Sequence, residues 1–213
     1  MLDRFKGFWQ GVVLMPFVHL FLRLGISPDA VTLVGTLGVA AGALIFFPEG
    51  MLLIGVLVIT AFVFSDLVDG QMARTSGRTS VFGAFWDSTL DRIGDGAVFG
   101  GLVLYFAGPG DSYLYLCLSL YCVVMGAVTS YARARAESLG MDARGGVAER
   151  ADRLVLILVA TGLSAIFGLQ WLVFGALWIL AVANTATVVF RIRKVHRQAV
   201  VLDAGAQAGP PAV

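Results

Sequence analysis

Long apolar stretches, each about the length of a bilayer-spanning helix, limit most strongly what this chain can fold into. Six such stretches occur along the sequence, at residues 28–47, 51–74, 82–106, 113–137, 150–167 and 170–190. A membrane-spanning helix needs about 20 predominantly apolar residues, and backbone polar groups within lipid are satisfied only in helices or closed barrels. The sequence therefore predicts an all-α polytopic membrane protein with six transmembrane helices.

The composition excludes a water-soluble domain. Apolar residues make up 58% of the 213 residues and charged residues only 14%, whereas a soluble domain carries about 25% charged residues. The two cysteines, Cys117 and Cys122, lie in one apolar stretch without metal or redox spacing. The lipid bilayer is thus an expected partner, and we expect no nucleic-acid partner.

Basic residues are distributed unevenly between the two ends of the predicted helices. All 15 lysines and arginines fall on or toward the side that carries the connectors 75–81 and 138–149 and both termini. The opposite connectors, which contain no basic residue, are 48–50, 107–111 and 168–170. Because cytoplasmic loops are enriched in Lys and Arg, we expect a plasma-membrane protein with both termini, and any functional site on this side, facing the cytoplasm.

The segments outside the six helices suggest three regions. Residues 1–24 contain an apolar run interrupted by Pro16, which favours an amphipathic interfacial helix lying beside the membrane. Residues 25–194 form the predicted six-helix transmembrane domain, which would carry any functional site. Residues 195–213 end in small residues and prolines and are predicted to be a disordered cytoplasmic tail.

Aspartates in and beside the second and third predicted helices need compensation, because an ionisable group inside a bilayer costs at least about 2.5–3.5 kcal/mol. Asp66 and Asp69 are three residues apart, and Asp87 and Asp91 are four apart, so each pair shares a helix face. The short connector between the helices predicts that the two pairs face each other. Divalent Mg²⁺ or Mn²⁺, which prefer oxygen ligands, would relieve the repulsion. Two ions would balance four carboxylates.

Aspartate–arginine pairing without metal is the alternative, but Arg74 and Arg92 are too few for this acidic cluster, which also includes Asp95. Small residues also lie near the carboxylates, at Gly70, Ala73 and Gly83. They either leave room for a flat group such as a base or a ribose, or they serve helix packing. Their spacing does not decide between these two roles.

The order of these residues resembles the signature of the CDP-alcohol phosphotransferase family. All eight positions match, namely Asp66, Asp69, Gly70, Ala73, Arg74, Gly83, Asp87 and Asp91. The resemblance implies a six-span, usually homodimeric membrane enzyme. Such an enzyme cleaves the pyrophosphate of a CDP-linked donor, transfers a phosphoalcohol or phosphatidyl group to a hydroxyl, and releases CMP.

The same resemblance implies individual roles. Asp66, Asp69 and Asp87 would hold one divalent ion, and Asp66, Asp87 and Asp91 a second. Asp91 would also be the general base. Donor-binding residues would comprise Asp66 and Asp69 together with Gly70, Ala73, Arg74 and Gly83. Pro28-Asp29-Ala30-Val31-Thr32 resembles the Pro-Asn-x-x-Thr start of the family's first helix, which adds Asp29 and Thr32. Ser27 and Pro28 are also an ordinary helix start.

Basic residues in the second half favour an anionic acceptor, because guanidinium groups suit phosphate. The stretches 130–137 (SYARARAE) and 149–156 (ERADRLVL) resemble bacterial members of the family that use CDP-diacylglycerol and inositol 1-phosphate. The resemblance implies that Arg133, Arg153 and Arg193 bind the acceptor phosphate. We expect Lys194 and Arg197 to be simple head-group anchors.

Two other functions are compatible with the aspartates. The same chemistry with glycerol 3-phosphate or free inositol as acceptor would need the same carboxylates. A divalent-cation transporter would need polar groups along a complete path, but the outer halves of the predicted helices, such as 51–60 and 97–106, carry no charge. The sequence therefore favours the enzyme.

Overall fold

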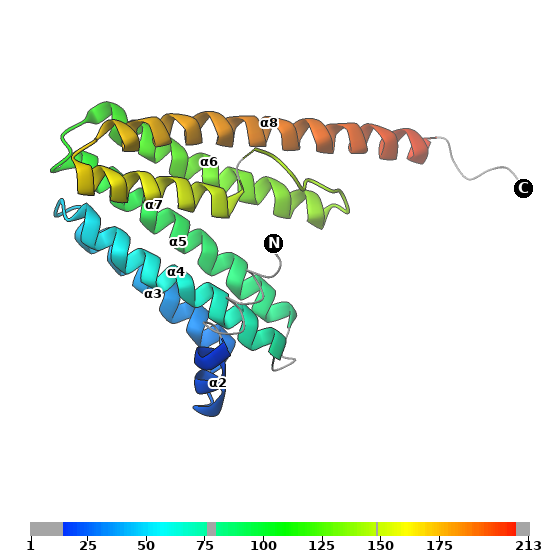
Figure 1. Cartoon of the computed structure of the whole chain (residues 1–213). Coiled ribbons are helices and arrows are strands. Elements are labelled where there is room, and N and C mark those ends of the chain that lie inside the picture. The colour runs from blue at the N-terminus through cyan, green and yellow to red at the C-terminus, as the bar shows by residue number, and fades with distance from the viewer. Residues whose placement is uncertain (1–14, 76–79, 148, 208–213) are drawn as a thin grey trace, which may run out of the picture. The chain divides into compact units, whose positions relative to one another are not determined.

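The computed structural model describes residues 15–75, 80–147 and 149–207, without the side chains of 65–67, 69, 73 and 205–207. Within these residues the chain is helical and contains no strand. The helices, drawn in Figure 1, are α2 (Met15–Arg23), α3 (Pro28–Phe46), α4 (Leu52–Thr75), α5 (Val81–Ala107), α6 (Tyr113–Ser138), α7 (Arg150–Phe167) and α8 (Trp171–Gln207). Helices α3 to α8 begin and end within one residue of the six predicted stretches, except at the C-terminus of α8.

Three helices in the described part of the chain are long and apolar enough to cross a membrane, with bounds Pro28–Phe46, Tyr113–Ser138 and Trp171–Ala204. The region Leu52–Phe64 of α4 is a shorter apolar helix. Helix α5 carries Asp87, Asp91, Arg92 and Asp95, which lowers its hydropathy. The all-helical fold is confirmed, whereas the full number of six spans stays a prediction.

Helix α8 is longer than predicted. It has 37 residues, about 55 Å at 1.5 Å per residue, and it includes residues 195–207 of the predicted disordered tail. This part of the tail prediction was wrong, because Arg, Lys, Gln and Ala are good helix formers and side chains as far as Gln198 are held by the preceding loop. Residues 208–213 lie outside the described residues.

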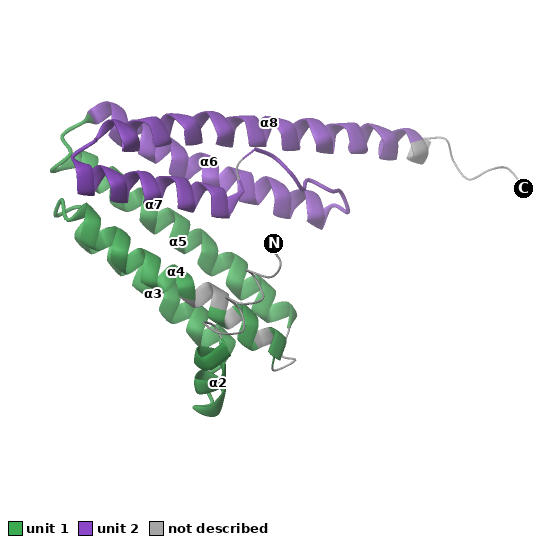
Figure 2. Ribbon diagram, in the orientation of Figure 1, with its two compact units in different colours: residues 1–112 green, residues 113–213 purple. Residues whose placement is uncertain are grey.

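The chain divides into two compact units, Met1–Ser112 and Tyr113–Val213, coloured separately in Figure 2. In the first unit α3 packs against both α4 and α5. The Phe47 ring lies 2.6 Å from the point where a Cβ on Gly55 of α4 would be, and 3.0 Å from the same point on Gly101 of α5. Glycines therefore make the space that lets a bulky ring sit against both neighbouring helices.

Two glycines four residues apart let α3 pack closely against α4. A Cβ on Gly38 would overlap the Phe62 ring, and one on Gly42 would lie 2.9 Å from Ile59 Cγ1. Gly96 and Gly100 on α5 show the same spacing, but no described group lies within 4 Å of a Cβ added there. Of these two glycine pairs, the α3 pair is therefore the one against which described side chains pack closely.

In the second unit α8 packs against α6 and α7. The rings of Tyr115 and Phe174 stack with centroids 3.7 Å apart and planes inclined by 4°, and the Tyr121 and Thr185 hydroxyls are 2.6 Å apart. Tyr121 follows Tyr115 along α6, and its partner Thr185 likewise follows Phe174 along α8. The two helices therefore run in the same direction.

Candidate active site

The N-terminal ends of α3 and α5 meet in the first unit. The Ser27 hydroxyl caps α3 by accepting from Ala30 N, and the Ser80 hydroxyl caps α5 by accepting from Gly83 N at 2.8 Å. Trp86 on α5 donates its indole N–H to the Asp29 carbonyl at 3.1 Å. The two helix starts are thus fixed to each other.

This contact brings together residues predicted to bind the donor. A Cβ on Gly83 would lie 3.5 Å from Asp29 Oδ1, so a larger residue at 83 would crowd the Asp29 carboxylate. Thr32, one turn into α3, is buried and donates its hydroxyl to the Pro28 carbonyl at 3.1 Å. The Thr32 hydroxyl therefore already donates a hydrogen bond within α3.

The C-terminal half of α4 packs against the same end of α3. Val68 and Met72 are buried with Val31 of α3 and Val18 of α2, in a cluster that Phe21, Leu22 and Ile26 partly cover. Val18 is fully buried there, whereas Phe17 and Leu20 of α2 are about half exposed. An apolar core therefore holds α4 beside the start of α3. The buried residues of α4 lie within the same stretch, 66–74, as its signature residues.

Of those α4 residues, Gly70 and Arg74 have described surroundings. No described group lies within 4 Å of a Cβ added to Gly70, and Arg74 is exposed near the end of the helix. Asp66, Asp69 and Ala73 are helical positions of α4 whose side chains lie outside the description. Their contacts stay predictions.

On α5, Asp87 and Asp91 are one helical turn apart and face the same side. Asp87 is exposed, and the Asp91 side chain is 19% exposed with Oδ2 3.5 Å from Arg92 Nη2. Accessible carboxylate oxygens on one face fit the preference of Mg²⁺ and Mn²⁺ for hard oxygen ligands. The described side chains alone include no group of three His, Cys, Asp or Glu residues that could hold an ion. Asp66 and Asp69, whose side chains lie outside the description, stay the predicted further ligands.

The second unit contains the three arginines predicted to bind the acceptor. Arg153 on α7 is only 2% exposed, and its Nη1 lies 3.6 Å from the point where a Cβ on Gly126 of α6 would be. Arg133 on α6 donates from Nε to Glu137 Oε1 at 3.0 Å, with its side chain 43% exposed. Arg193 on α8 is exposed. Each of the three helices supplies one of them.

Arg191 is a buried arginine for which the sequence predicts no special role. It is 4% exposed and donates from Nη1 to the Thr129 carbonyl of α6 and from Nε to the Gly145 carbonyl at 3.2 Å. No spacing rule distinguishes it from Arg193, because both follow the apolar part of α8. Only the packing of α8 against α6 separates the structural arginine from the exposed one.

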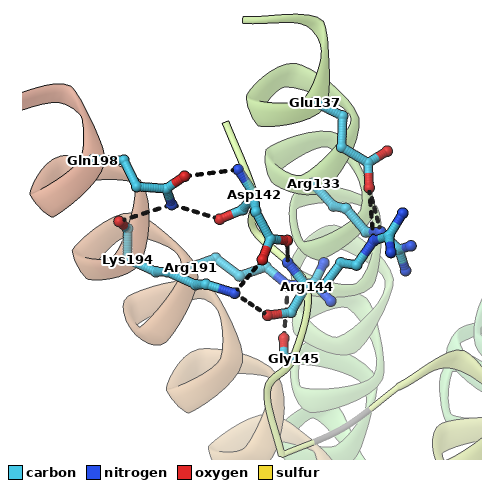
Figure 3. A network of polar contacts seen from close by, with 8 residues as sticks. All are labelled: Arg133, Glu137, Asp142, Arg144, Gly145, Arg191, Lys194 and Gln198. Carbon is cyan, nitrogen blue, oxygen red and sulfur yellow. Dashed lines mark hydrogen bonds and ion pairs between the residues drawn. The ribbon is translucent and has the colours of Figure 1, made fainter. Parts of the chain in front are cut away.

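Residues 142–147, which we call the strap, run along α8 (Figure 3). The strap contacts α8 residues that are three or four apart and share a face, namely Thr187, Arg191, Lys194 and Gln198. Gly145 and Gly146 have φ values of 98° and 136°, which strain other residues. A Cβ on Gly146 would also overlap the Thr187 side chain.

An ion pair fixes one end of the strap. Lys194 Nζ lies 2.7 Å from Asp142 Oδ2 and donates to the Arg144 carbonyl at 2.9 Å, while Gln198 bonds both backbone polar groups of Asp142. The hydrogen bond from Lys194, and then that from Arg144 N, lowers the pKa of the Asp142 carboxyl below its usual value. Lys194 is therefore a specific partner of the strap, which the prediction of a simple head-group anchor missed.

Comparison with known proteins identifies the class. Residues 25–189 match the CDP-alcohol phosphatidyltransferase family, and the chain belongs to this family. Together with its apolar helices, this makes it an integral membrane enzyme that transfers a phosphatidyl group.

The chain is similar to phosphatidylinositol phosphate synthases. It is 49% identical to that of Streptomyces avermitilis, over 98% of this chain and 88% of the relative, and 47% identical to that of Cutibacterium acnes, over 92% and 98%. It also resembles two crystal structures of the Mycobacterium tuberculosis synthase. The one with CDP-DAG bound gives a TM-score of 0.82 at 40% identity, covering 86% of this chain and 93% of that one. The one with manganese and citrate gives 0.80 at 39%, covering 86% and 88%.

Proposed function

We propose that this enzyme transfers the phosphatidyl group of CDP-diacylglycerol to a hydroxyl of inositol 1-phosphate, giving phosphatidylinositol phosphate and CMP. The observation that carries the proposal is the 49% identity to a phosphatidylinositol phosphate synthase over 98% of the chain. The family signature and the convergence of the α3 and α5 starts support the use of a CDP-linked donor. The arginines of the second unit support a phosphorylated acceptor.

In the proposed reaction, the acceptor hydroxyl oxygen forms a bond to the phosphorus that carries diacylglycerol, and the bond from that phosphorus to the CMP oxygen breaks. Asp91 accepts the hydroxyl proton. Its Oδ2 lies 3.5 Å from Arg92 Nη2, and its side chain is 19% exposed. Arg74, exposed at the end of α4, would hold the donor pyrophosphate.

Mg²⁺ or Mn²⁺ fits the oxygen-rich donor set, and we propose that Asp66, Asp69, Asp87 and Asp91 hold two such ions. When bound, the ions would neutralise charge on the pyrophosphate and on the attacking and leaving oxygens. Gly70, Ala73 and Gly83 would leave room for the cytidine, with Asp29 and Thr32 at the start of α3 completing the donor site. Arg133, Arg153 and Arg193 would bind the acceptor phosphate.

We further propose six transmembrane helices in the plasma membrane, with α2 belonging to an interfacial N-terminal segment and both termini in the cytoplasm. The asymmetric distribution of Lys and Arg supports this orientation. The active site would then face the cytoplasm, where a soluble acceptor and CMP exchange freely. A homodimer is proposed by resemblance to the family.

The test is CMP release by the purified full chain with Mg²⁺ or Mn²⁺, CDP-diacylglycerol and each of three acceptors in parallel. We expect release with inositol 1-phosphate and little with glycerol 3-phosphate or inositol. Preference for either of the other acceptors would retain the chemistry and overturn the proposed acceptor. Asp91→Asn serves as the inactive control, and Asp111→Asn as the matched control, because Asp111 is an exposed aspartate in the connector between α5 and α6.

A further inference from the structure

Arg144 lies at the centre of the strap, and its backbone is fixed on both sides. Its N–H donates to Asp142 Oδ1 at 2.8 Å, and its carbonyl accepts from Lys194 Nζ at 2.9 Å. The next residue, Gly145, is held through its carbonyl by Arg191. An arginine on an ordinary surface loop lacks such anchoring, so Arg144 gives up little backbone freedom when its side chain binds a ligand.

The guanidinium of Arg144 is directed toward α6. Its Nε lies 3.8 Å from Glu137 Oε1, the oxygen to which Arg133 donates at 3.0 Å. Figure 3 shows the two guanidinium groups beside the same carboxylate. Two positive charges therefore share one negative charge, which leaves an excess of one positive charge at this place.

Among the described residues, Glu137 is the acid that forms ion pairs with Arg133 and Arg144, and the other acids near the strap have other partners. Asp142 is engaged by Lys194, and Glu149 and Asp152 form the capping box at the start of α7, where Asp152 Oδ2 accepts from Glu149 N at 3.1 Å. The Arg144 side chain is 75% exposed and can reach a bound anion. A phosphate dianion beside Glu137 would find two guanidinium groups already in place.

We propose that Arg144 binds the phosphate of the acceptor together with Arg133, and that the Asp142–Lys194 pair is the positioning element that holds Arg144 there. This inference rests on the proposed function, which makes the acceptor a polyol phosphate. It adds a residue from the strap to the arginines that α6, α7 and α8 supply. It also gives the strap a role in acceptor recognition as well as in packing.

The first experiment compares Arg144→Gln with Arg135→Gln. Arg135 is an exposed arginine on α6 whose Nη1 contacts the Ser138 hydroxyl at 3.4 Å, so this variant removes the same charge from a nearby surface. We expect Arg144→Gln to raise the KM for inositol 1-phosphate about tenfold, as for the loss of a hydrogen bond to a charged group. The donor KM and kcat should stay within about twofold, and Arg135→Gln should resemble the wild type.

The second experiment tests the positioning role by a double-mutant cycle. Asp142→Asn should raise the acceptor KM in the wild-type background and have no further effect in the Arg144→Gln background. Equal effects in both backgrounds would overturn the role of the Asp142–Lys194 pair. Inorganic phosphate as a competing probe gives a second measurement, and its inhibition constant should weaken in Arg144→Gln but not in Arg135→Gln.

The outcomes separate this inference from the proposed function. Absence of CMP release by the wild type with inositol 1-phosphate would overturn the proposed function. An active wild type with an unchanged acceptor KM in Arg144→Gln would overturn the inference alone, as would an equal rise of that KM in both arginine variants. Melting temperatures of the two arginine variants close to that of the wild type exclude misfolding as the cause of a raised KM.

Discussion

The indole N–H of Trp86 donates to the main-chain carbonyl of Asp29 at 3.1 Å, and so joins the first turns of α5 and α3 across 57 positions of the sequence. Asp29, which supplies the accepting carbonyl, and Gly83, three residues before Trp86 on α5, are both predicted to bind the donor. The bond therefore holds the two helix starts that form the proposed donor site. Neither the indole of Trp86 nor the main-chain carbonyl of Asp29 is itself predicted to contact the donor.

Trp86→Phe should weaken donor binding while leaving acceptor binding unchanged. One hydrogen bond contributes about 0.5–1.5 kcal/mol, so we expect the KM for CDP-diacylglycerol to rise about two- to tenfold. Initial rates at varied donor and acceptor concentrations measure both constants. Trp178→Phe is the control, since Trp178 is 49% exposed on α8. A change confined to the acceptor KM would contradict the expectation.

Asp91→Asn should remove catalysis without unfolding the protein. A general base contributes about 10²–10⁴-fold to rate, and we expect kcat to fall by at least about 10²-fold. Asp87→Asn should instead raise the Mn²⁺ concentration required for half-maximal activity. Metal removal with a chelator should abolish CMP release in the wild type. Asp111→Asn, whose φ of 36° is tolerated by asparagine, should titrate with Mn²⁺ like the wild type.

Gly101→Ala should destabilise the first unit much more than Gly100→Ala. The added Cβ at 101 would lie 2.6 Å from the Ala43 carbonyl oxygen, whereas no described group lies within 4 Å of a Cβ at 100. Overpacking of this kind costs about 1–3 kcal/mol. Thermal unfolding in detergent measures the difference between these adjacent substitutions. Equal melting temperatures would show that α5 and α3 separate at little cost.

Arg191→Met and Arg193→Gln should affect different properties. Arg191→Met leaves the carbonyls of Thr129 and Gly145 without their donor, which costs about 1–3 kcal/mol for a buried acceptor, so the melting temperature should fall. Arg193→Gln should leave the melting temperature unchanged and raise the acceptor KM about tenfold, because it removes an exposed charge from the proposed phosphate site. A lower melting temperature in Arg193→Gln together with a raised acceptor KM in Arg191→Met would contradict this assignment of the two arginines.

The Asp142–Lys194 pair should contribute to stability at neutral pH and lose its contribution in acid. The folded-state pKa of Asp142 is lowered, first by the hydrogen bond from Lys194, so the stabilisation is present above the ordinary carboxyl pKa of about 4 and disappears as the pH falls through the folded value. The melting temperature of the wild type should therefore exceed that of Asp142→Asn at pH 7 and converge with it below about pH 4. A difference that stays constant down to pH 3 would contradict this linkage.

The helices of this protein could be predicted closely because their ends are local in the sequence. Ser27 and Pro28 start α3 where expected. The family signature could also be recognised from the sequence, because its residues lie within 26 positions on two consecutive helices. Of the predicted site residues, the described contacts bring together Asp29 and Gly83.

The second unit was harder to predict, because its important contacts join distant positions. The bonds of Arg191 to Thr129 and Gly145 span 62 and 46 residues, and spacing along α8 does not specify which of its basic residues faces α6. The extension of α8 beyond residue 194 was missed for the same reason. Small and polar residues indicated a tail, whereas Lys194 and Gln198 are held by a loop about 50 positions earlier.

The boundary between Ser112 and Tyr113 separates two kinds of recognition. All residues proposed to bind metal and donor precede it, and all those proposed to bind the acceptor follow it, each group supported by contacts within its own half of the chain. Acceptor preference is then an exchangeable property. Substitutions in the second half can adapt the enzyme to a different alcohol, or a chimera can supply another second half, while the machinery that activates the cytidine diphosphate donor is inherited intact.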